Sequence, residues 1–271
     1  KGKSSRRLRR RVWVLAVLCL VVTGLLGWWL YNWSMVDSKL TSLADCDGGI
    51  YRKEIPGPDW FKTWVEKYRL PVPRRPVHFA SSTITDADMK YVARARTLRG
   101  ITLVRCPVTD AGMRHLRKMS NVTELNLNST LVSDKTLEYI SNMVDLRDLH
   151  LHRTAVTDAG LTHLVAFRKL QFLGLGSTSV TDKGARILTN IKSLRFLDLG
   201  GTQITDAALE QIAKMRNLQG LYLFGTDITD KGLRHLKLLN SLLEISVSQT
   251  AATAEGISEL KAALPKLNVM E

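Results

Sequence analysis

The chain has 271 residues, of which 45% are hydrophobic, and this is enough to bury a substantial core. Its three cysteines exclude a small fold held together by a disulfide framework. The formal net charge is +14, but residues 1–11 alone carry seven Lys and Arg and no acidic side chain. Half of the net charge therefore belongs to a basic tail, and the composition does not require nucleic acid as a partner.

An uncharged apolar segment follows the tail. Residues 12–31 have the length of a helix that spans a bilayer. Trp13 stands near one end, and Trp28 and Trp29 stand near the other, which is typical of the two membrane interfaces. A cleaved signal peptide is the alternative, but the apolar run is long and no small-residue cleavage site follows it. We expect a transmembrane signal anchor, with residues 1–11 as a basic cytoplasmic tail and the rest of the chain outside the cytoplasm.

Two segments precede the regular part of the chain. Residues 32–58 contain several Gly and Pro and are predicted to be a linker. Residues 59–75 begin with an amphipathic helical pattern, which Pro71 ends. We interpret this segment as an N-terminal cap that covers the first repeat, and a ligand site is the alternative. Its aromatic stripe consists of Trp60, Phe61, Trp64 and Tyr68.

A Thr-Asp or Ser-Asp pair then recurs every 24 residues without a slip. A fixed period of this length predicts a solenoid of stacked repeats. An eighth unit keeps Thr253 but has Ala254 in place of the acid. The seven pairs begin at Thr85, Thr109, Ser133, Thr157, Thr181, Thr205 and Thr229.

Each unit combines a strand pattern with a helix pattern. In one unit Leu149 and Leu151 alternate with polar residues, and then Leu161 and Leu164 continue at helical spacing. The Thr of each pair is expected to cap the helix N-terminus, and the Asp to lie in its first turn, where the helix dipole favours a negative charge. The same pattern extends to a first strand near residue 77 and a ninth near residue 267.

Two further slots recur with the same period. Small hydrogen-bonding residues after the strand are expected to bind loop backbone of the neighbouring coil. They are Ser82, Cys106, Thr130, Thr154, Thr178, Thr202, Thr226 and Thr250. Glycines after the N-cap are expected to allow close packing between repeats, and they are Gly112, Gly160, Gly184, Gly232 and Gly256.

The repeat pattern LxLxxTxVTDxGLxxLxxLxxL resembles that of the leucine-rich repeat family. The segment CPVTDAGM, which contains Cys106, is most similar to the cysteine-containing subtype of this family and to its bacterial membrane-anchored relatives. The resemblance covers residues 76–271. It implies an α/β solenoid, with parallel strands on the concave side and short helices on the convex side, preceded here by the transmembrane helix.

The search for chemistry gives no catalytic motif. A phosphate-binding glycine loop, a GxSxG elbow and an HExxH helix are all missing from the sequence. Asp148, His150 and His152 alternate along one strand, so a zinc site is an alternative to a polar binding surface, but no second pair of ligands is evident. We predict that the protein is not an enzyme and needs no metal or other cofactor.

The outward positions of the strands predict a binding surface. Phe172 and Phe196 are expected to be neighbours, and Gly174, Gly176 and Gly200 are expected to leave a shallow pit beside them. Exposed aromatic residues around a depression are typical of a hot spot for a protein or peptide partner. The predicted partner-binding residues are Asp148, His150, His152, Phe172, Phe196, Asp198, Tyr222 and Phe224.

These patterns predict a membrane-anchored protein, in a bacterial inner membrane facing the periplasm, that binds a protein or peptide through its concave face. No Lys or Arg lies in the concave columns, so nucleic acid is not expected as a partner. One alternative is a structural envelope protein whose basic convex face binds cell-wall polymer or membrane. A second, implied by the resemblance, is a substrate adaptor of a ubiquitin ligase. The oligomeric state stays open.

Overall fold

The computed structural model describes residues 77–80, 84–95 and 98–270. The predicted basic tail, membrane anchor, linker and cap helix all lie outside these residues, as does Ser82 of the hydrogen-bonding slot. None of the helices in the described part has the length and apolar character that a bilayer span requires.

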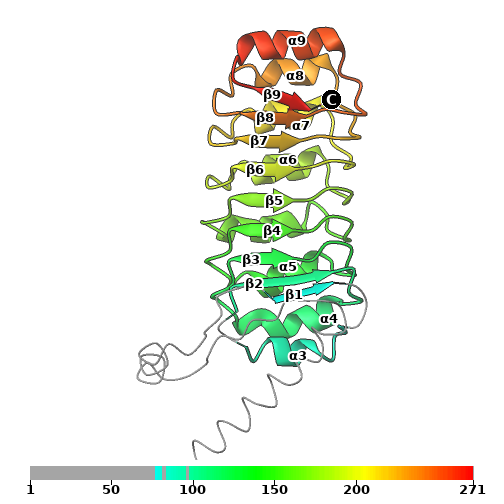
Figure 1. Ribbon diagram of the computed structural model, residues 1–271, viewed down its shortest axis with the longest axis vertical. Helices are drawn as coiled ribbons and strands as arrows, with labels where there is room; N and C mark the ends of the chain where they lie inside the picture. Colours follow the sequence, from blue (N-terminus) through cyan, green and yellow to red (C-terminus); the bar gives the residue numbers. More distant parts are fainter. Residues whose placement is uncertain (1–76, 81–83, 96–97, 271) are drawn as a thin grey trace, which may run out of the picture.

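One parallel sheet runs along the whole described chain (Figure 1). Its strands follow one another in chain order, and each pairs with the next in a register of 24 residues, such as Leu125 with Leu149. The predicted strands and their register are therefore confirmed, including the first and the ninth. The strands in the described residues are β1 (Val77–Ala80), β2 (Gly100–Val104), β3 (Glu124–Asn126), β4 (Asp148–His150), β5 (Phe172–Gly174), β6 (Phe196–Asp198), β7 (Gly220–Tyr222), β8 (Glu244–Ser246) and β9 (Asn268–Met270).

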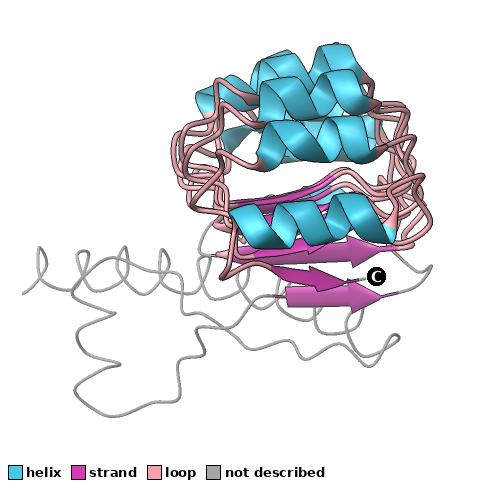
Figure 2. Cartoon of the chain, turned by 90° about the horizontal axis from the view of Figure 1, so that it is seen from above, coloured by secondary structure: helices cyan, strands magenta, loops and turns pink. Residues whose placement is uncertain are grey.

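Short helices return the chain from one strand to the next, and they lie on one side of the sheet (Figure 2). We call the opposite side of the sheet the strand face. The predicted helix that follows Thr157 is a 3-10 helix, which suits its inward residues at every third position. The helices are α3 (Met89–Val92), α4 (Asp110–Met113), η1 (Arg114–Lys118), α5 (Asp134–Ile140), η2 (Gly160–Ala166), α6 (Asp182–Leu188), α7 (Asp206–Ile212), α8 (Asp230–Leu236) and α9 (Ala254–Ala263).

The core lies between the sheet and the helices. Leu149 and Leu151 from the strand segment, and Leu161 and Leu164 from the helix, are fully buried, as their spacing predicts. Their counterparts in the other repeats join them in one continuous cluster. Each repeat thus buries its apolar residues against its two neighbours, which is how a solenoid is stabilised.

The aspartates of the Thr-Asp pairs link successive repeats, a role that the sequence analysis missed. Asp110 accepts hydrogen bonds from the backbone N–H of Ser133 at 2.9 Å and from its hydroxyl at 2.6 Å. Every pair repeats this bridge to the next, so we call the set Asp86, Asp110, Asp134, Asp158, Asp182, Asp206 and Asp230 the aspartate ladder.

The predicted capping role of the threonines is confirmed beside this ladder. The Thr109 hydroxyl donates to Asp86 and also accepts from the backbone N–H of Ala111 at 3.1 Å. Asp110 lies in the first turn of its helix, as predicted. The hydroxyls of Thr181, Thr205 and Thr229 likewise cap their own helices and bind the preceding repeat, whereas the Ser133 hydroxyl makes the bridge to the preceding repeat without capping its helix.

The recurring glycines are explained by the same ladder. A Cβ atom added at Gly184 would overlap Oδ1 of Asp158 in the preceding repeat and would lie 2.8 Å from Leu161. Thr136 stands in the glycine slot of another repeat, where its hydroxyl donates a third hydrogen bond to Asp110 at 2.6 Å. The close packing that the glycines predict is confirmed, and its reason is the carboxylate that lies against them.

The second ladder binds within its own repeat, not to the neighbouring coil as predicted. The hydroxyl of Thr154 donates to the carbonyl oxygen of Leu151 at 2.6 Å, and Thr202 does the same to Leu199. The chain turns back sharply after each strand, which brings this carbonyl within reach of a residue three positions later. These hydroxyls therefore fix the turn inside each coil.

Candidate functional site

The strand face displays side chains in three columns, because the middle residue of each short strand points into the core. Phe172 pairs with Phe196 across the sheet, which confirms the predicted neighbourhood. The first column contains Glu124, Asp148, Phe172, Phe196, Gly220 and Glu244; the middle column contains Asn126, His150, Gly174, Asp198, Tyr222 and Ser246; the third contains Asn128, His152, Gly176, Gly200, Phe224 and Ser248.

All eight predicted partner-binding residues lie on this face, but they form two groups. The first group consists of Asp148, His150, Phe172 and Phe196, and all four are half-buried. The second consists of His152, Asp198, Tyr222 and Phe224, which line one groove. In the second group, Phe224 is the most open, with 46% of its surface exposed.

The predicted shallow pit is confirmed in part: Gly176 and Gly200 line an open hollow, but the side chain of His152 fills the space over Gly174. The imidazole of His152 lies over Gly174 and over Gly176, where an added Cβ would meet Nδ1 at 2.6 Å. Nε2 of the same ring lies 3.7 Å from a carboxylate oxygen of Asp198. The absence of side chains at Gly174 and Gly176 thus makes room for the histidine, and Gly176 and Gly200 also line the hollow beside it.

In the first group, the ring of His150 packs on Phe172. The ring centroids are 4.5 Å apart and the ring planes are tilted by 31°. Burial lowers the pKa of His150, and the neighbouring His152 lowers it further against the opposing effect of Asp148 and Asp198. Burial raises the pKa of Asp148, whereas His150 and Arg147 act to lower it. Both pKa shifts favour the neutral forms of His150 and Asp148.

The alternative of a zinc site finds no ligand set in the structure. His150 packs against an aromatic ring while His152 approaches Asp198. Among the described residues, no group of three or more His, Cys, Asp or Glu side chains is placed to hold a metal ion.

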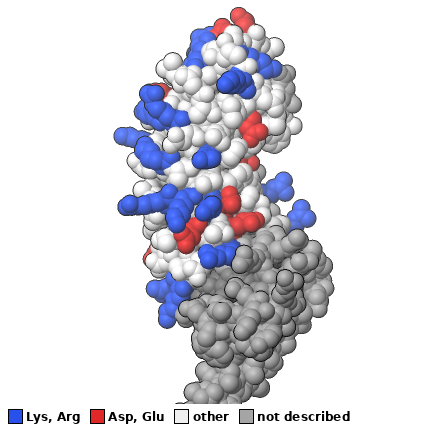
Figure 3. Space-filling model, turned by 60° about the vertical axis from the view of Figure 1, so that its left-hand side comes forward, with Lys and Arg blue, Asp and Glu red and all other residues white. Residues whose placement is uncertain are grey.

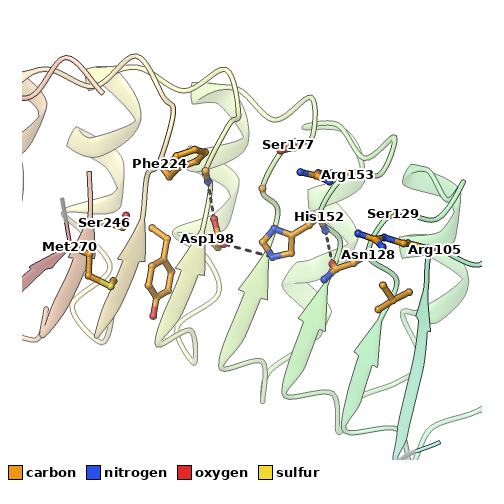
Figure 4. A pocket seen from close by; sticks show the side chains of 14 residues that line it. Arg105, Asn128, Ser129, His152, Arg153, Ser177, Asp198, Phe224, Ser246 and Met270 are labelled. Carbon is orange, nitrogen blue, oxygen red and sulfur yellow. Dashed lines mark hydrogen bonds and ion pairs between the residues drawn. The ribbon is translucent and has the colours of Figure 1, made fainter. Parts of the chain in front are cut away.

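The second group lines an open groove of about 670 Å³ along the ends of the strands (Figure 4). One end of the groove is apolar and contains Tyr222, Phe224 and Met270. The other end is polar and basic, with Arg105 and Arg153 on its rim. A ligand that lies along the stack would therefore meet apolar side chains at one end and cations at the other.

The two arginines were missed because they follow the three columns. Arg105 and Arg153 adopt positive φ angles of 58° and 54°, in a slot where Gly201 and Gly225 also have positive φ. Glycine favours this conformation, so two glycines 24 residues apart were the available signal for a tight bend there. The three columns contain no Lys or Arg in the described residues, as predicted, but the groove that they border does have cations.

At the apolar end of the groove, a tyrosine and a glutamate from adjacent repeats form a hydrogen bond. The hydroxyl of Tyr222 donates to Oε1 of Glu244 at 2.5 Å. Burial, and then this hydrogen bond, raise the pKa of Tyr222 to about 12. The tyrosine therefore stays protonated as a donor at any physiological pH, and its ring is held in place beside Phe224.

Comparison with known proteins identifies the repeat but no function. A leucine-rich repeat family model matches residues 190–213 and 214–237. No curated protein matches the chain.

The structural matches include two internalins of Listeria monocytogenes. Internalin InlF is 19% identical, with a TM-score of 0.56, over 67% of this chain and 50% of that protein. Internalin C2 is 22% identical, also with a TM-score of 0.56, over 72% of this chain and 80% of that protein. This chain thus spans about half the length of the first match, and identities this low establish a common fold alone. The two matched units continue in one register through the parallel sheet, so the described repeats share the leucine-rich repeat fold.

Proposed function

We propose that the strand face binds a protein or peptide partner, with the groove beside His152, Asp198, Tyr222 and Phe224 as the principal contact. The observation that carries this proposal is Phe224, a large aromatic side chain left 46% exposed in the turn after β7, beside polar groups. Aromatic anchors of this kind dominate the affinity of many protein interfaces. Solenoids of stacked repeats commonly use such extended surfaces to bind other proteins.

The shape of the groove favours an extended segment of the partner. It follows the stack of strands, and side chains from β2 to β9 or from the turns beside them line it. Its apolar end suits a hydrophobic side chain, while Arg105 and Arg153 suit an acidic one. The surface is preorganised, because Tyr222 and His152 are each held by a neighbouring carboxylate.

Replacement of Tyr222 and Phe224 by alanine tests the proposal, because both side chains line the groove. Tyr222 is half-buried and Phe224 is exposed, and neither belongs to the core. We expect the double variant to keep its circular dichroism spectrum and to lose most partner recovery in a pull-down. Unchanged recovery by a folded variant would remove the proposal.

The alternative function, a structural envelope protein that binds cell-wall polymer or membrane, depends on cationic side chains on the helix side. Arg114, Arg117 and Lys183 are exposed there, which is compatible with binding to an anionic polymer or membrane. Added salt separates the two readings, since binding through exposed charges weakens steeply with ionic strength and an aromatic contact does not. The ubiquitin-ligase alternative remains a prediction, as do the membrane anchor and the placement of the repeats outside the cytoplasm.

A further inference from the structure

A second hollow lies on the turns that lead from each helix to the next strand. It has a volume of about 480 Å³. Its lining includes six cations and no acidic side chain, and Figure 3 shows blue side chains gathered along the stack. We call this surface the basic edge, and its cations are Arg147, Arg168, Lys169, Lys192, Arg195 and Arg216.

Most of this charge has no partner within the described part of the chain. Lys169 is paired with Asp145 at 2.6 Å, and this hydrogen bond lowers the pKa of Asp145. Lys192 donates to a backbone carbonyl. The four guanidinium groups, by contrast, make no hydrogen bond or ion pair among the described residues, and they belong to Arg147, Arg168, Arg195 and Arg216.

The repeat sets these cations in a row. Arg168, Lys192 and Arg216 occupy one slot of three consecutive coils, and Arg147 and Arg195 occupy another slot two coils apart. Neighbouring coils are separated by about 4.8 Å, which is the distance between paired strands. Like charges at this spacing repel one another, so a line of negative charge along the edge would be favourable.

The fold does not use the four arginine side chains for hydrogen bonds among the described residues. The same turns are joined through backbone groups, as when the N–H of Arg195 donates to the carbonyl of Gln171 at 2.8 Å. All six cationic residues are exposed. In addition, the hydroxyls of Ser193 and Ser241 in the lining are buried and have no hydrogen-bond partner in the described part. An anionic oxygen that reached them would supply the missing bond.

From these contacts we propose that the basic edge binds a linear polymer with a phosphate group at each unit. The planar fork of arginine donates two hydrogen bonds to one phosphate, and here four guanidinium groups that make no hydrogen bond among the described residues share one hollow, with only Arg147 near the carboxylates of Asp145 and Asp148. A thread fits a row of cations several coils long, whereas a flat membrane would touch only the rim of the hollow. This surface is separate from the strand-face groove, because the two share no lining residue.

The test compares two variants of the full chain with equal charge. The edge variant replaces Arg147, Arg168, Arg195 and Arg216 by glutamine, and the control replaces four exposed cations of the helix side: Arg114, Arg117, Lys183 and Arg186. Each lowers the formal net charge from +14 to +10 (14 − 4), and both keep the basic tail of residues 1–11. The probe is fluorescent long-chain inorganic polyphosphate, with anisotropy measured over a series of salt concentrations.

We expect the edge variant to raise the Kd for polyphosphate about tenfold or more and to reduce its salt dependence, because contacts to phosphate groups are lost. The control variant should change the Kd less than about threefold, since its charges are not gathered at the site. Equal weakening in both variants, or none in the edge variant, would overturn the proposal. So would a larger effect of the edge substitutions on phosphatidylglycerol vesicles, on single-stranded DNA or on polyglutamate than on polyphosphate.

Discussion

The aspartate ladder and the strand face lie in the same repeats and differ in how their residues vary. Along the ladder, the residue is Asp in seven successive coils, and each one makes the same bridge to the next coil. Along the middle column, six successive coils give Asn126, His150, Gly174, Asp198, Tyr222 and Ser246. Positions that hold the stack together therefore repeat their residue, whereas positions on the strand face, which carry no such bridge, vary from coil to coil.

Removal of one aspartate from each region tests whether the ladder stabilises the fold more than the strand face does. Asp110→Ala deletes three hydrogen bonds to the next coil, and Asp198→Ala deletes one to Gly200 and the contact with His152. We expect Asp110→Ala to lower the free energy of unfolding by about 2–4 kcal/mol and Asp198→Ala by about 1 kcal/mol or less. Urea unfolding followed by circular dichroism measures both. Equal losses would show that the two regions do not differ as we describe.

The glycine slot offers a second, smaller test. Gly184→Ala places a methyl group against Asp158 and Leu161, and we expect a loss of about 1–3 kcal/mol. Ala208 already occupies this slot in another coil, where the hydroxyl bond from Thr205 to Asp182 is 2.8 Å instead of the 2.6 Å at Thr181 and Asp158. The matched control, Ala208→Gly, should cost about 1 kcal/mol or less, through helix propensity. A neutral Gly184→Ala variant would contradict the tight packing.

The ladder also predicts a dependence on pH. Burial raises the pKa of Asp110, but the hydrogen bonds from Ser133 and Thr136 together outweigh burial, and the net pKa lies below the usual value. A lowered pKa means that the carboxylate stabilises the fold at pH above about 4, and that this contribution is lost as the pH falls through the lower value of the folded protein. The stability gap between the wild type and Asp110→Asn should therefore narrow below about pH 4. A gap that stays constant from pH 7 to pH 2 would contradict this role of Asp110.

The smallest expected effect concerns the strand face. Because the pKa of Tyr222 is raised to about 12, its phenol should ionise well after that of an ordinary tyrosine. The difference in phenolate absorbance between the wild type and Tyr222→Phe isolates this group from the other five tyrosines. Glu244→Gln removes the charge that Tyr222 faces and should lower its pKa. Titration of Tyr222 near pH 10 in the wild type would show that the pair does not form.

The sequence predicts well which residues occupy equivalent positions in successive repeats, and it predicts poorly where their side chains point. The period placed Leu149 in the core and Phe172 beside Phe196, because register alone decides which residues share a slot. It did not predict that His152 would lie over two glycines, since this depends on a rotamer. It also assigned each aspartate to its own helix, because the partner of Asp110 lies 23 residues away, in the next coil.

The surface cations show the same limit. The basic face expected on the helix side includes Arg114 and Lys183, which are exposed there. It gave no reason to single out Arg147 or Arg195, which belong to turns and come together only when the coils are stacked. Sites formed between turns of different repeats have no local sequence pattern.

A photo-crosslinking amino acid placed at Phe224 tests most directly whether the strand face is the surface that binds. The matched control is Val165 on the helix side, which is 43% exposed where Phe224 is 46% exposed. In intact cells we expect a discrete protein adduct from position 224, lost when Tyr222 is replaced by alanine, and no such adduct from position 165. An adduct from position 165 alone, or the same adduct from both positions, would contradict the assignment of binding to the strand face.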